Sequence, residues 1–238
     1  MWDNHRLLDR IATLLYALAA VAIAHAAVVA AIRSPMFALR EIEVVGDTNH
    51  TSPAQARALA ARELHGTFFT VDLDQASATF AKLPWVRTAQ VRRVWPDRLV
   101  VTLEEHVPLA RWNGEALVNQ QGEVFDAKTD APLPAFVGPA GTSAEIARSH
   151  AAFREMLAGV GRRPIEVRLS VRRAWQIELD DGRILELGRQ DLLPRLARYV
   201  AAYRTIVAHV PPGARIDLRY ENGFAIRQPG LRWGEQPA

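Results

Sequence analysis

The sequence predicts an α+β protein anchored by a single transmembrane helix, and three observations support this fold class. Residues 11–32 form an uncharged apolar run, IATLLYALAAVAIAHAAVVAAI. Residues 37–106 show the order strand, helix, helix, strand, strand, and residues 107–228 show many short strands with two helices among them. We therefore expect a tail at 1–10, a span at 11–32, folded blocks at 37–106 and 107–228, and a tail at 229–238.

Composition argues against several classes of protein. The chain has 238 residues, 49% of them hydrophobic, and a formal net charge of +3, which suits two modest domains. Its 29 basic residues are dispersed among 26 acidic ones and not concentrated as in a nucleic-acid-binding protein. The absence of cysteine excludes disulfides, cysteine-ligated metals and thiol nucleophiles.

The apolar run is long enough to cross a membrane. Arg10 and Arg33 bracket it, and a helix of this length rises about 33 Å, against about 30 Å of hydrocarbon. Ala24-His25-Ala26 has the form of a signal-peptidase site, so a cleaved signal peptide is the alternative. We favour an uncleaved anchor because apolar residues continue to Ile32.

The charges around the span leave its orientation open. Arg6 and Arg10 precede it, whereas Arg33 and Arg40 follow it, so the positive-inside count is a tie. His25 lies inside the span, and we interpret it as a neutral imidazole that bonds to a neighbouring helix or a backbone carbonyl.

The first block is expected to form a small sheet covered by two helices. Ser52–Gln55 supplies a cap, a proline at the first helical position and a capping box. Asp72 or Asp74 caps the second helix, which Pro84 is expected to end. The strands are expected at 41–46, 89–92 and 99–104, the last two joined by a turn at 96–97.

The second block is expected to form a mainly antiparallel sheet with flanking helices. Asn113-Gly114 and Asn222-Gly223 are hairpin-turn signals, Ser143 is a helix cap, and residues 126–142 read as a proline- and glycine-rich loop. Strands are expected at 109–112, 115–118, from 122, and at 165–169, 174–179, 183–187, 215–220 and 224–227, and helices at 143–157 and 192–207.

Little in the sequence points to catalysis. The seven histidines show no pair at metal-ligand spacing, and the six serines show no nucleophile-elbow motif. Glu104 and Glu105 are neighbours in a strand and point to opposite faces, so they could not share a site. We therefore expect no enzyme activity, metal, cofactor or small-molecule substrate.

The last hairpin is the candidate interaction site. Its final strand ends the fold, and an unpaired strand edge offers free N–H and C=O groups that an incoming segment can complete. An ordinary closing hairpin is the alternative interpretation.

The motifs, taken in order, resemble those of the FtsQ/DivIB family of bacterial division proteins. Each motif is short, but their order is specific and the match covers nearly the whole chain. The motifs are IEVVG at 42–46, LPWV at 83–86, VRRVWPD at 91–97, PLARW at 108–112, GEVF at 122–125, RRAWQ at 172–176, LGR at 187–189, RLAR at 195–198 and IDLRY at 216–220.

The resemblance implies a POTRA domain at 37–106 and an FtsQ-type β-domain at 107–228. It implies a cytoplasmic N-terminus, a periplasmic remainder, and a location in the inner membrane, enriched at the division septum. The implied role is a non-enzymatic divisome scaffold that binds FtsB-like and FtsL-like proteins and links early to late division proteins.

In this family the partner adds a strand beside the last strands of the β-domain. The resemblance therefore places partner binding at Arg219, Tyr220, Asn222, Gly223 and Phe224. It also implies that Arg172 or Arg173 offers a charge to an acidic partner residue, and that Val44, Gly46 and Pro84 belong to a recruitment face of the POTRA domain.

Two alternatives remain on sequence grounds. POTRA domains also occur in protein transport and outer-membrane assembly systems, but a barrel would need many more strands than the roughly 130 residues after the first block provide. A secreted soluble binding protein is the other alternative, and loss of residues 1–26 from the mature chain would favour it.

Overall fold

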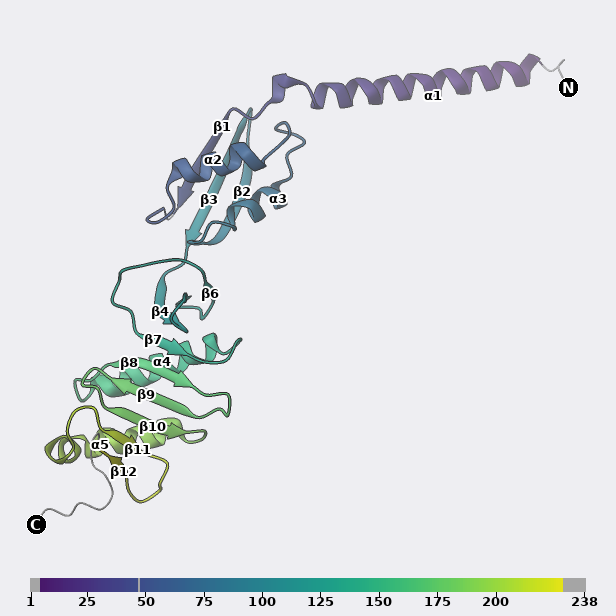
Figure 1. Cartoon of the computed structure of the whole chain (residues 1–238). Coiled ribbons are helices and arrows are strands. Elements are labelled where there is room, and N and C mark those ends of the chain that lie inside the picture. The colour runs from purple at the N-terminus through teal and green to yellow at the C-terminus, as the bar shows by residue number, and fades with distance from the viewer. Residues whose placement is uncertain (1–4, 47, 229–238) are drawn as a thin grey trace, which may run out of the picture. The chain divides into compact units, whose positions relative to one another are not determined.

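The computed structural model describes residues 5–46 and 48–228 and divides into two compact units, Met1–Glu105 and His106–Ala238 (Figure 1). The chain is an α+β protein, which confirms the predicted fold class. The expected C-terminal tail lies outside the described residues, and so do residues 1–4 of the expected N-terminal tail.

The first unit contains an apolar helix followed by a small mixed domain. Its elements are α1 (His5–Ile32), a 3-10 turn (Pro35–Phe37), β1 (Glu41–Gly46), α2 (Pro53–Glu63), α3 (Leu73–Phe80), β2 (Val86–Val94) and β3 (Arg98–Glu105).

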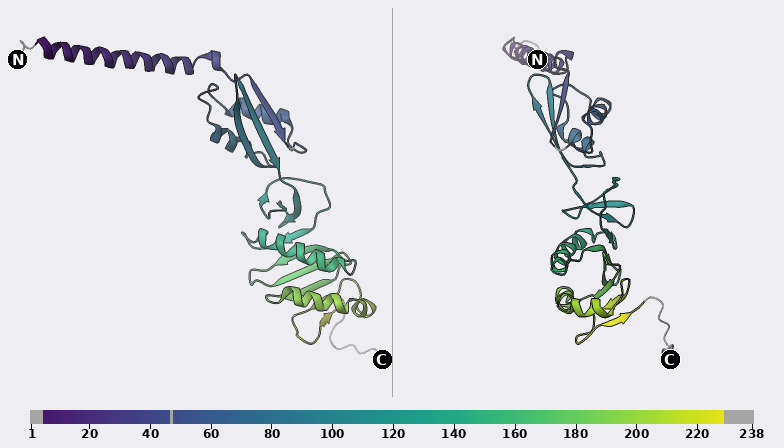
Figure 2. Two further views of the ribbon diagram at one scale, coloured as in Figure 1. Left: turned by 180° about the vertical axis from the view of Figure 1, so that it is seen from behind. Right: turned by 90° about the vertical axis from the view of Figure 1, so that its left-hand side faces the viewer.

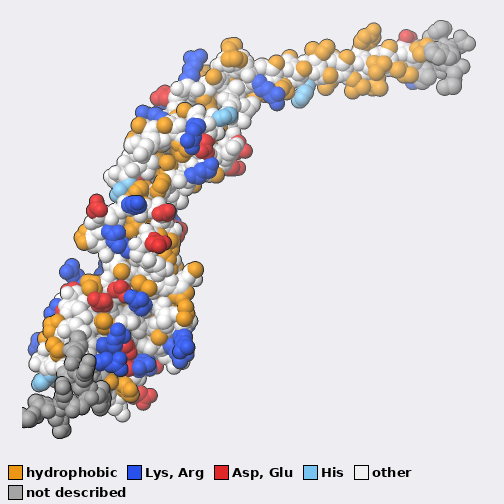
Figure 3. Space-filling view, viewed as in Figure 1, with side chains coloured by type: hydrophobic (Ala, Val, Ile, Leu, Met, Phe, Trp, Pro, Cys, Tyr) orange, Lys and Arg blue, Asp and Glu red, His pale blue; other side chains and the backbone are white. Residues whose placement is uncertain are grey.

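Helix α1 is long and apolar enough to span a membrane from Leu8 to Ile32. Its large apolar side chains are exposed on every side; Leu14, Tyr16 and Ile23 are 62%, 77% and 70% exposed. Figure 3 shows hydrophobic side chains distributed along the length of this helix. An apolar helix with no protein packed against it is stable in a bilayer rather than in water, so α1 has the length and the surface of a membrane anchor.

The small domain of the first unit is a three-stranded sheet covered on one face by α2 and α3 (Figure 2). The strand order is β1-β3-β2, with β1 parallel and β2 antiparallel to the central β3. The core lies between sheet and helices and contains Ala56, Ala60, Phe80, Val101 and Leu103, each at most 2% exposed. Both β1 and β2 are edge strands.

The predicted helix starts are confirmed in this domain. The Ser52 hydroxyl accepts from Gln55 N, and the Gln55 side chain accepts from Ser52 N, which completes the capping box. Asp72 caps α3 by accepting from the amides of Asp74 and Gln75. The expected end of α3 was wrong, because the helix ends at Phe80, before Pro84, in hydrogen-bonded turns.

Glu105, the last residue of β3, is a buried carboxylate with several donors. It accepts hydrogen bonds from His50 N at 3.0 Å and from Thr51 N at 2.6 Å, and it lies 3.1 Å from His50 Nδ1. Burial alone would raise the pKa of Glu105, but the hydrogen bonds from Thr51 and His50 outweigh it and lower that pKa. The carboxylate thereby fixes the segment that leads into α2.

The second unit is built on a nine-stranded sheet with α4 and α5 packed on one face (Figure 2). Its elements are β4 (Pro108–Trp112), β5 (Ala116–Asn119), β6 (Val124–Phe125), β7 (Ala135–Val137), α4 (Ser143–Ala158), β8 (Pro164–Leu169), β9 (Trp175–Leu179), β10 (Ile184–Gly188), α5 (Leu192–His209), β11 (Arg215–Asp217) and β12 (Ala225–Arg227). The strand order is β12-β11-β10-β9-β8-β7-β4-β5-β6.

The sheet is mainly antiparallel, as expected, but three strand pairs are parallel. These pairs are β10–β11, β7–β8 and β4–β7. The last two exist because a short strand, β7, lies inside the segment 126–142 that the sequence predicted as a loop. Phe136 at the centre of β7 is fully buried and anchors the segment in the core.

Two local predictions in the second unit were wrong. Ser143 is the first residue of α4 and not its cap, because its hydroxyl donates to Gly122 O at 2.6 Å. The strands of the last hairpin are also shorter than expected, with residues 218–224 connecting them. Neither Asn222 nor Gly223 has the positive φ that a tight two-residue hairpin turn requires.

Candidate functional site

Strand β12 forms one edge of the nine-stranded sheet. It pairs antiparallel with β11, and within residues 48–228 no strand pairs with its other side. All three of its residues, Ala225, Ile226 and Arg227, are exposed, and the Ile226 side chain is 44% exposed. A short exposed edge of this kind is a template for an added strand.

The register of the neighbouring strands shows which groups of β12 point outward. Two hydrogen bonds flank β11: Ile184 N donates to Ala214 O at 3.0 Å, and Leu218 N donates to Glu186 O at 2.9 Å. The backbone N–H and C=O groups of even-numbered residues along β11 therefore point toward β10. Because backbone groups alternate in direction along a strand, those of the odd-numbered residues of β11 point toward β12, where their partners are Ala225 and Arg227. The amide and carbonyl of Ile226 therefore point to the open edge.

The connection before β12 carries the predicted site residues 220–224. Tyr220 is 58% exposed, and Asn222 and Gly223 are also exposed. Phe224 is different, since it is half-buried and packs against the core of the second unit. The structure therefore places Tyr220, Asn222 and Gly223 on the surface beside the edge and gives Phe224 a packing role.

Arg198 of α5 holds this connection in place. Its guanidinium donates to Tyr220 O at 2.9 Å, to Leu218 O at 3.0 Å, and also to Glu221 O. One side chain thus satisfies three carbonyl groups, within four residues, of a segment that is not part of a strand. The sequence motifs did not predict this role for Arg198. The position of an arginine on the polar face of a predicted helix, near a turn, could have indicated it.

Arg219 lies beside the edge but is already engaged within the chain. Its Nε donates to both carboxylate oxygens of Asp217, at 2.8 and 3.0 Å, and its Nη2 lies 3.9 Å from a carboxylate oxygen of Glu186. The hydrogen bond from Arg219 lowers the pKa of Asp217, while the same pair raises the pKa of Arg219. A partner carboxylate would share this guanidinium with Asp217.

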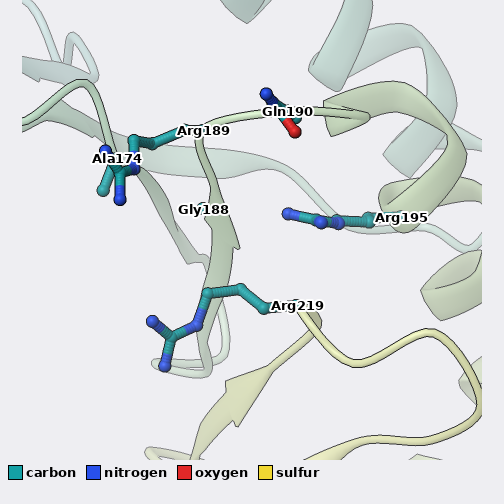
Figure 4. Close-up of a pocket in the computed structure, with 6 residues that line it drawn as sticks. All are labelled: Ala174, Gly188, Arg189, Gln190, Arg195 and Arg219. Atoms are coloured by element: carbon teal, nitrogen blue, oxygen red, sulfur yellow. The ribbon is translucent and has the colours of Figure 1, made fainter.

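A shallow, positively charged depression of about 490 Å³ lies next to Arg219. Its lining residues are Ala174, Gly188, Arg189, Gln190, Arg195 and Arg219 (Figure 4). Gly188 has a φ of +79°, and a Cβ there would lie 2.8 Å from Arg195 Nη1 and 3.0 Å from Arg219 Cγ. Glycine at this position therefore lets two arginines approach the backbone at the end of β10.

The two arginines predicted to offer a charge differ in their surroundings. Both are exposed in the turn between β8 and β9, one or two residues before Ala174 of the depression. Arg173 has a φ of +65° and forms an ion pair with Glu145 of α4 at 2.5 Å. Arg172 forms no ion pair with any residue that the structure describes.

The three predicted recruitment residues lie on the first unit. Val44 is half-buried against its core, and Gly46 ends β1 with a φ of +100°, where a Cβ would lie 2.2 Å from Leu103 O. Pro84 is exposed after α3. The fold alone therefore accounts for the residue types at positions 44 and 46. Gly46 and Pro84 are both exposed, but only Pro84 presents an exposed side chain.

Among the described residues, no three His, Asp or Glu side chains gather in a group that could hold a metal ion. The geometry supplies an open strand edge, exposed aromatic and polar side chains and a cluster of arginines. Such a surface is suited to binding a polypeptide, because backbone amides can pair with an incoming strand and guanidinium groups can pair with carboxylates.

Comparison with known proteins agrees with this architecture. The model of the FtsQ-type POTRA domain matches residues 37–106, and the model of the C-terminal region of cell division protein FtsQ/DivIB matches residues 110–219. The chain is 43% identical to cell division protein FtsQ of Nitrosospira multiformis, over 95% of this chain and 99% of that protein. It is 45% identical to FtsQ of Burkholderia pseudomallei, over 98% and 96%, and 31% identical to FtsQ of Neisseria gonorrhoeae, over 95% of each. With two matching domain models and nearly full-length relatives, the chain belongs to the FtsQ/DivIB family of cell-division proteins.

Proposed function

We propose that this chain is a non-enzymatic scaffold that binds FtsB- and FtsL-type proteins by strand addition at β12. Family membership gives it a role in the divisome, and α1 gives it a single membrane anchor. In the proposed topology the N-terminus is cytoplasmic, the POTRA and β-domains are periplasmic, and the protein gathers at the septum, where it links early to late division proteins.

The observation that carries this proposal is the outward-facing backbone of Ile226 on an exposed edge strand. An incoming strand would donate to its carbonyl and accept from its amide, and Tyr220, Asn222 and Gly223 would flank the added strand. Phe224 would support the edge by packing against the core.

The charges beside the edge indicate the chemistry of the partner. Arg189, Arg195 and Arg219 line the depression, and exposed Arg172 lies two residues before Ala174 on its wall. This arrangement complements acidic side chains on the incoming segment. Because Arg173 is paired with Glu145, we assign the contact to Arg172.

We also propose that the POTRA domain contributes to recruitment. Pro84 would lie on the contact face, whereas Val44 and Gly46 would act by maintaining edge strand β1.

The test is a matched pair of variants in the full chain, assayed for capture of a purified FtsB/FtsL-type complex. Ile226→Pro removes the outward amide while leaving the bonds to β11 intact, since proline is tolerated at the outward positions of an edge strand. Ile226→Ala removes the same side chain but keeps the amide. We expect the proline variant to lose about tenfold or more in affinity relative to alanine, because one hydrogen bond is lost and its acceptor on the partner is left unsatisfied at a buried interface.

Equal affinity of the proline and alanine variants would contradict strand addition at this edge. Tyr220→Ala and Arg172→Glu should each weaken capture, and Arg173→Glu should have a smaller effect. A larger effect of Arg173→Glu would overturn the assignment of the charged contact to Arg172.

A further inference from the structure

We propose that the end of the POTRA domain nearest α1 contacts the phospholipid surface from which the span emerges. This contact surface, here called the juxtamembrane end, consists of the 3-10 turn Pro35–Phe37, the loop 67–71 and the turn 95–97. The inference rests on α1 as the anchor and is independent of how partners bind β12.

Backbone hydrogen bonds hold these three segments together near the end of the span. Phe68 N donates to Phe37 O at 2.7 Å, and Arg40 N donates to Asp97 O at 3.0 Å. The Thr67 hydroxyl donates to the carbonyl of Ile32, the last residue of α1, at 2.8 Å. The loop and the turn are therefore tied to chain positions that lie within eight residues of the span.

Arg93 adds a further tie between the loop and the end of β2. Its Nε donates to Phe68 O at 2.7 Å, and its Nη2 donates to Val71 O at 2.5 Å. Arg93 lies two residues before Trp95, so the loop and the β2–β3 turn form one connected surface.

This surface exposes large apolar side chains. Met36 is 78% exposed, Trp95 is 76% exposed and Phe69 is 46% exposed. Phe69 is also supported from behind by edge-on contacts with Phe37 and Phe68, at centroid distances of 5.0 and 5.3 Å. Single exposed apolar residues are ordinary, but three on segments that are bonded together indicate a contact surface.

The chain length from the span fixes what this surface meets. Met36 follows Ile32 by four residues, which span at most about 14 Å when extended. The polar layer on each side of the hydrocarbon is roughly 5–8 Å thick. Met36 therefore lies at or next to the lipid headgroups, and Phe69 and Trp95 follow because their segments are bonded to residues 37–40.

The chemistry of these side chains suits the headgroup layer. Tryptophan is enriched at the membrane–water interface, where its ring is buried among lipids while its N–H stays hydrated. Arg33 and Arg40 are exposed on the same stretch of chain, and the Arg40 side chain is 71% exposed. Guanidinium groups pair well with the phosphates of lipid headgroups. The occupant is therefore a phospholipid surface, with a protein segment as the alternative that the test must separate.

The test uses single-cysteine variants of the full chain in phospholipid vesicles. The native chain has no cysteine, so each spin label reports one position without background. Labels at Met36→Cys, Phe69→Cys and Trp95→Cys are compared with a control at Asn49→Cys, which is exposed and lies next to the segment that Glu105 fixes at the opposite end of the domain. Accessibility to oxygen and to a water-soluble nickel chelate then gives the depth of each label.

We expect a several-fold higher ratio of oxygen to nickel accessibility at positions 36, 69 and 95 than at position 49. Labels at 69 and 95 that are as accessible to nickel as the label at 49 would overturn the proposal. Labels shielded from both reagents would also overturn it, because they would indicate a protein contact in place of lipid.

A second measurement needs no label and guards against disruption by the cysteine substitutions. Lipids brominated near the headgroup quench the emission of a tryptophan at the interface. Quenching should be weaker in a Trp95→Phe variant than in the native chain, and equal quenching in the two proteins would contradict the proposal.

Discussion

Acidification should destabilise the β-domain through one buried histidine, His150 of α4. The side chain is 4% exposed and its ring lies 5.0 Å from the ring of Phe136, centroid to centroid. Burial, with a smaller contribution from the charge of Arg154, lowers the pKa of His150 to about 4, from an ordinary value of 6.5. Between pH 6.5 and pH 4, His150 is therefore mostly protonated in the unfolded chain but mostly neutral in the folded chain.

The sign and size of the effect follow from that difference. Because the unfolded state binds more protons in this window, stability falls as pH falls from 6.5 toward 4. With these two pKa values the loss between pH 7 and pH 5 is about 2 kcal/mol. A His150→Leu variant, with a side chain of similar size, removes this titration and leaves the other groups unchanged.

The assay is urea unfolding of the full chain in detergent micelles at pH 7 and at pH 5, for native protein and for His150→Leu. The native chain should lose about 2 kcal/mol more than the variant on acidification. If both proteins lose the same amount, His150 is not desolvated in the folded β-domain and the packing of α4 described above is wrong.

Three further predictions concern single side chains. Glu105→Gln should destabilise the POTRA domain by about 2 kcal/mol, because the side-chain amide cannot accept all the hydrogen bonds that the carboxylate accepts. The Thr51 amide should then exchange faster with solvent, and unchanged exchange would contradict this. Gly46→Ala should cost about 1–3 kcal/mol in urea unfolding, since a Cβ there meets Leu103 O at a strained φ, and a neutral effect would refute the stated backbone geometry. Arg198→Ala should leave the free energy of unfolding nearly unchanged while raising proteolytic cleavage within 218–224, and equal cleavage of both proteins would count against its bracing role.

Local signals in the sequence predicted the helix starts and most of the strands. The capping box at Ser52 and the cap at Asp72 are interactions within three residues, so short-range chemistry decides them. The prediction that Ser143 caps α4 was wrong because a long-range interaction decides the role of this residue. Its hydroxyl bonds to Gly122, 21 residues away, and this long-range contact overrides the local preference.

Features that depend on the whole sheet could not be read from the sequence. Strand β7 is three residues long in a proline- and glycine-rich segment, and only its pairing with β4 and β8 makes it a strand. The connection in the last hairpin is longer than expected because Arg198 binds its carbonyl groups and Phe224 packs on the core. The outward direction of Ile226 follows from the β10–β11 register, to which no local motif corresponds.

The resemblance placed the candidate site in the segment that precedes the open edge strand but did not separate its members by role. Arg219 is paired with Asp217 and Arg173 with Glu145, whereas Arg172 has no ion pair among the described residues. These differences depend on which carboxylates the fold brings near, so they required the structure.

Amide hydrogen exchange of the full chain, with and without a bound FtsB/FtsL-type complex, tests strand addition at β12 most directly. If the partner adds a strand to β12, it slows exchange of the Ile226 amide, which faces the open edge. Exchange of the Ala225 and Arg227 amides changes little because they already face β11. An Ile226 amide that exchanges equally fast in the free and bound protein would contradict strand addition.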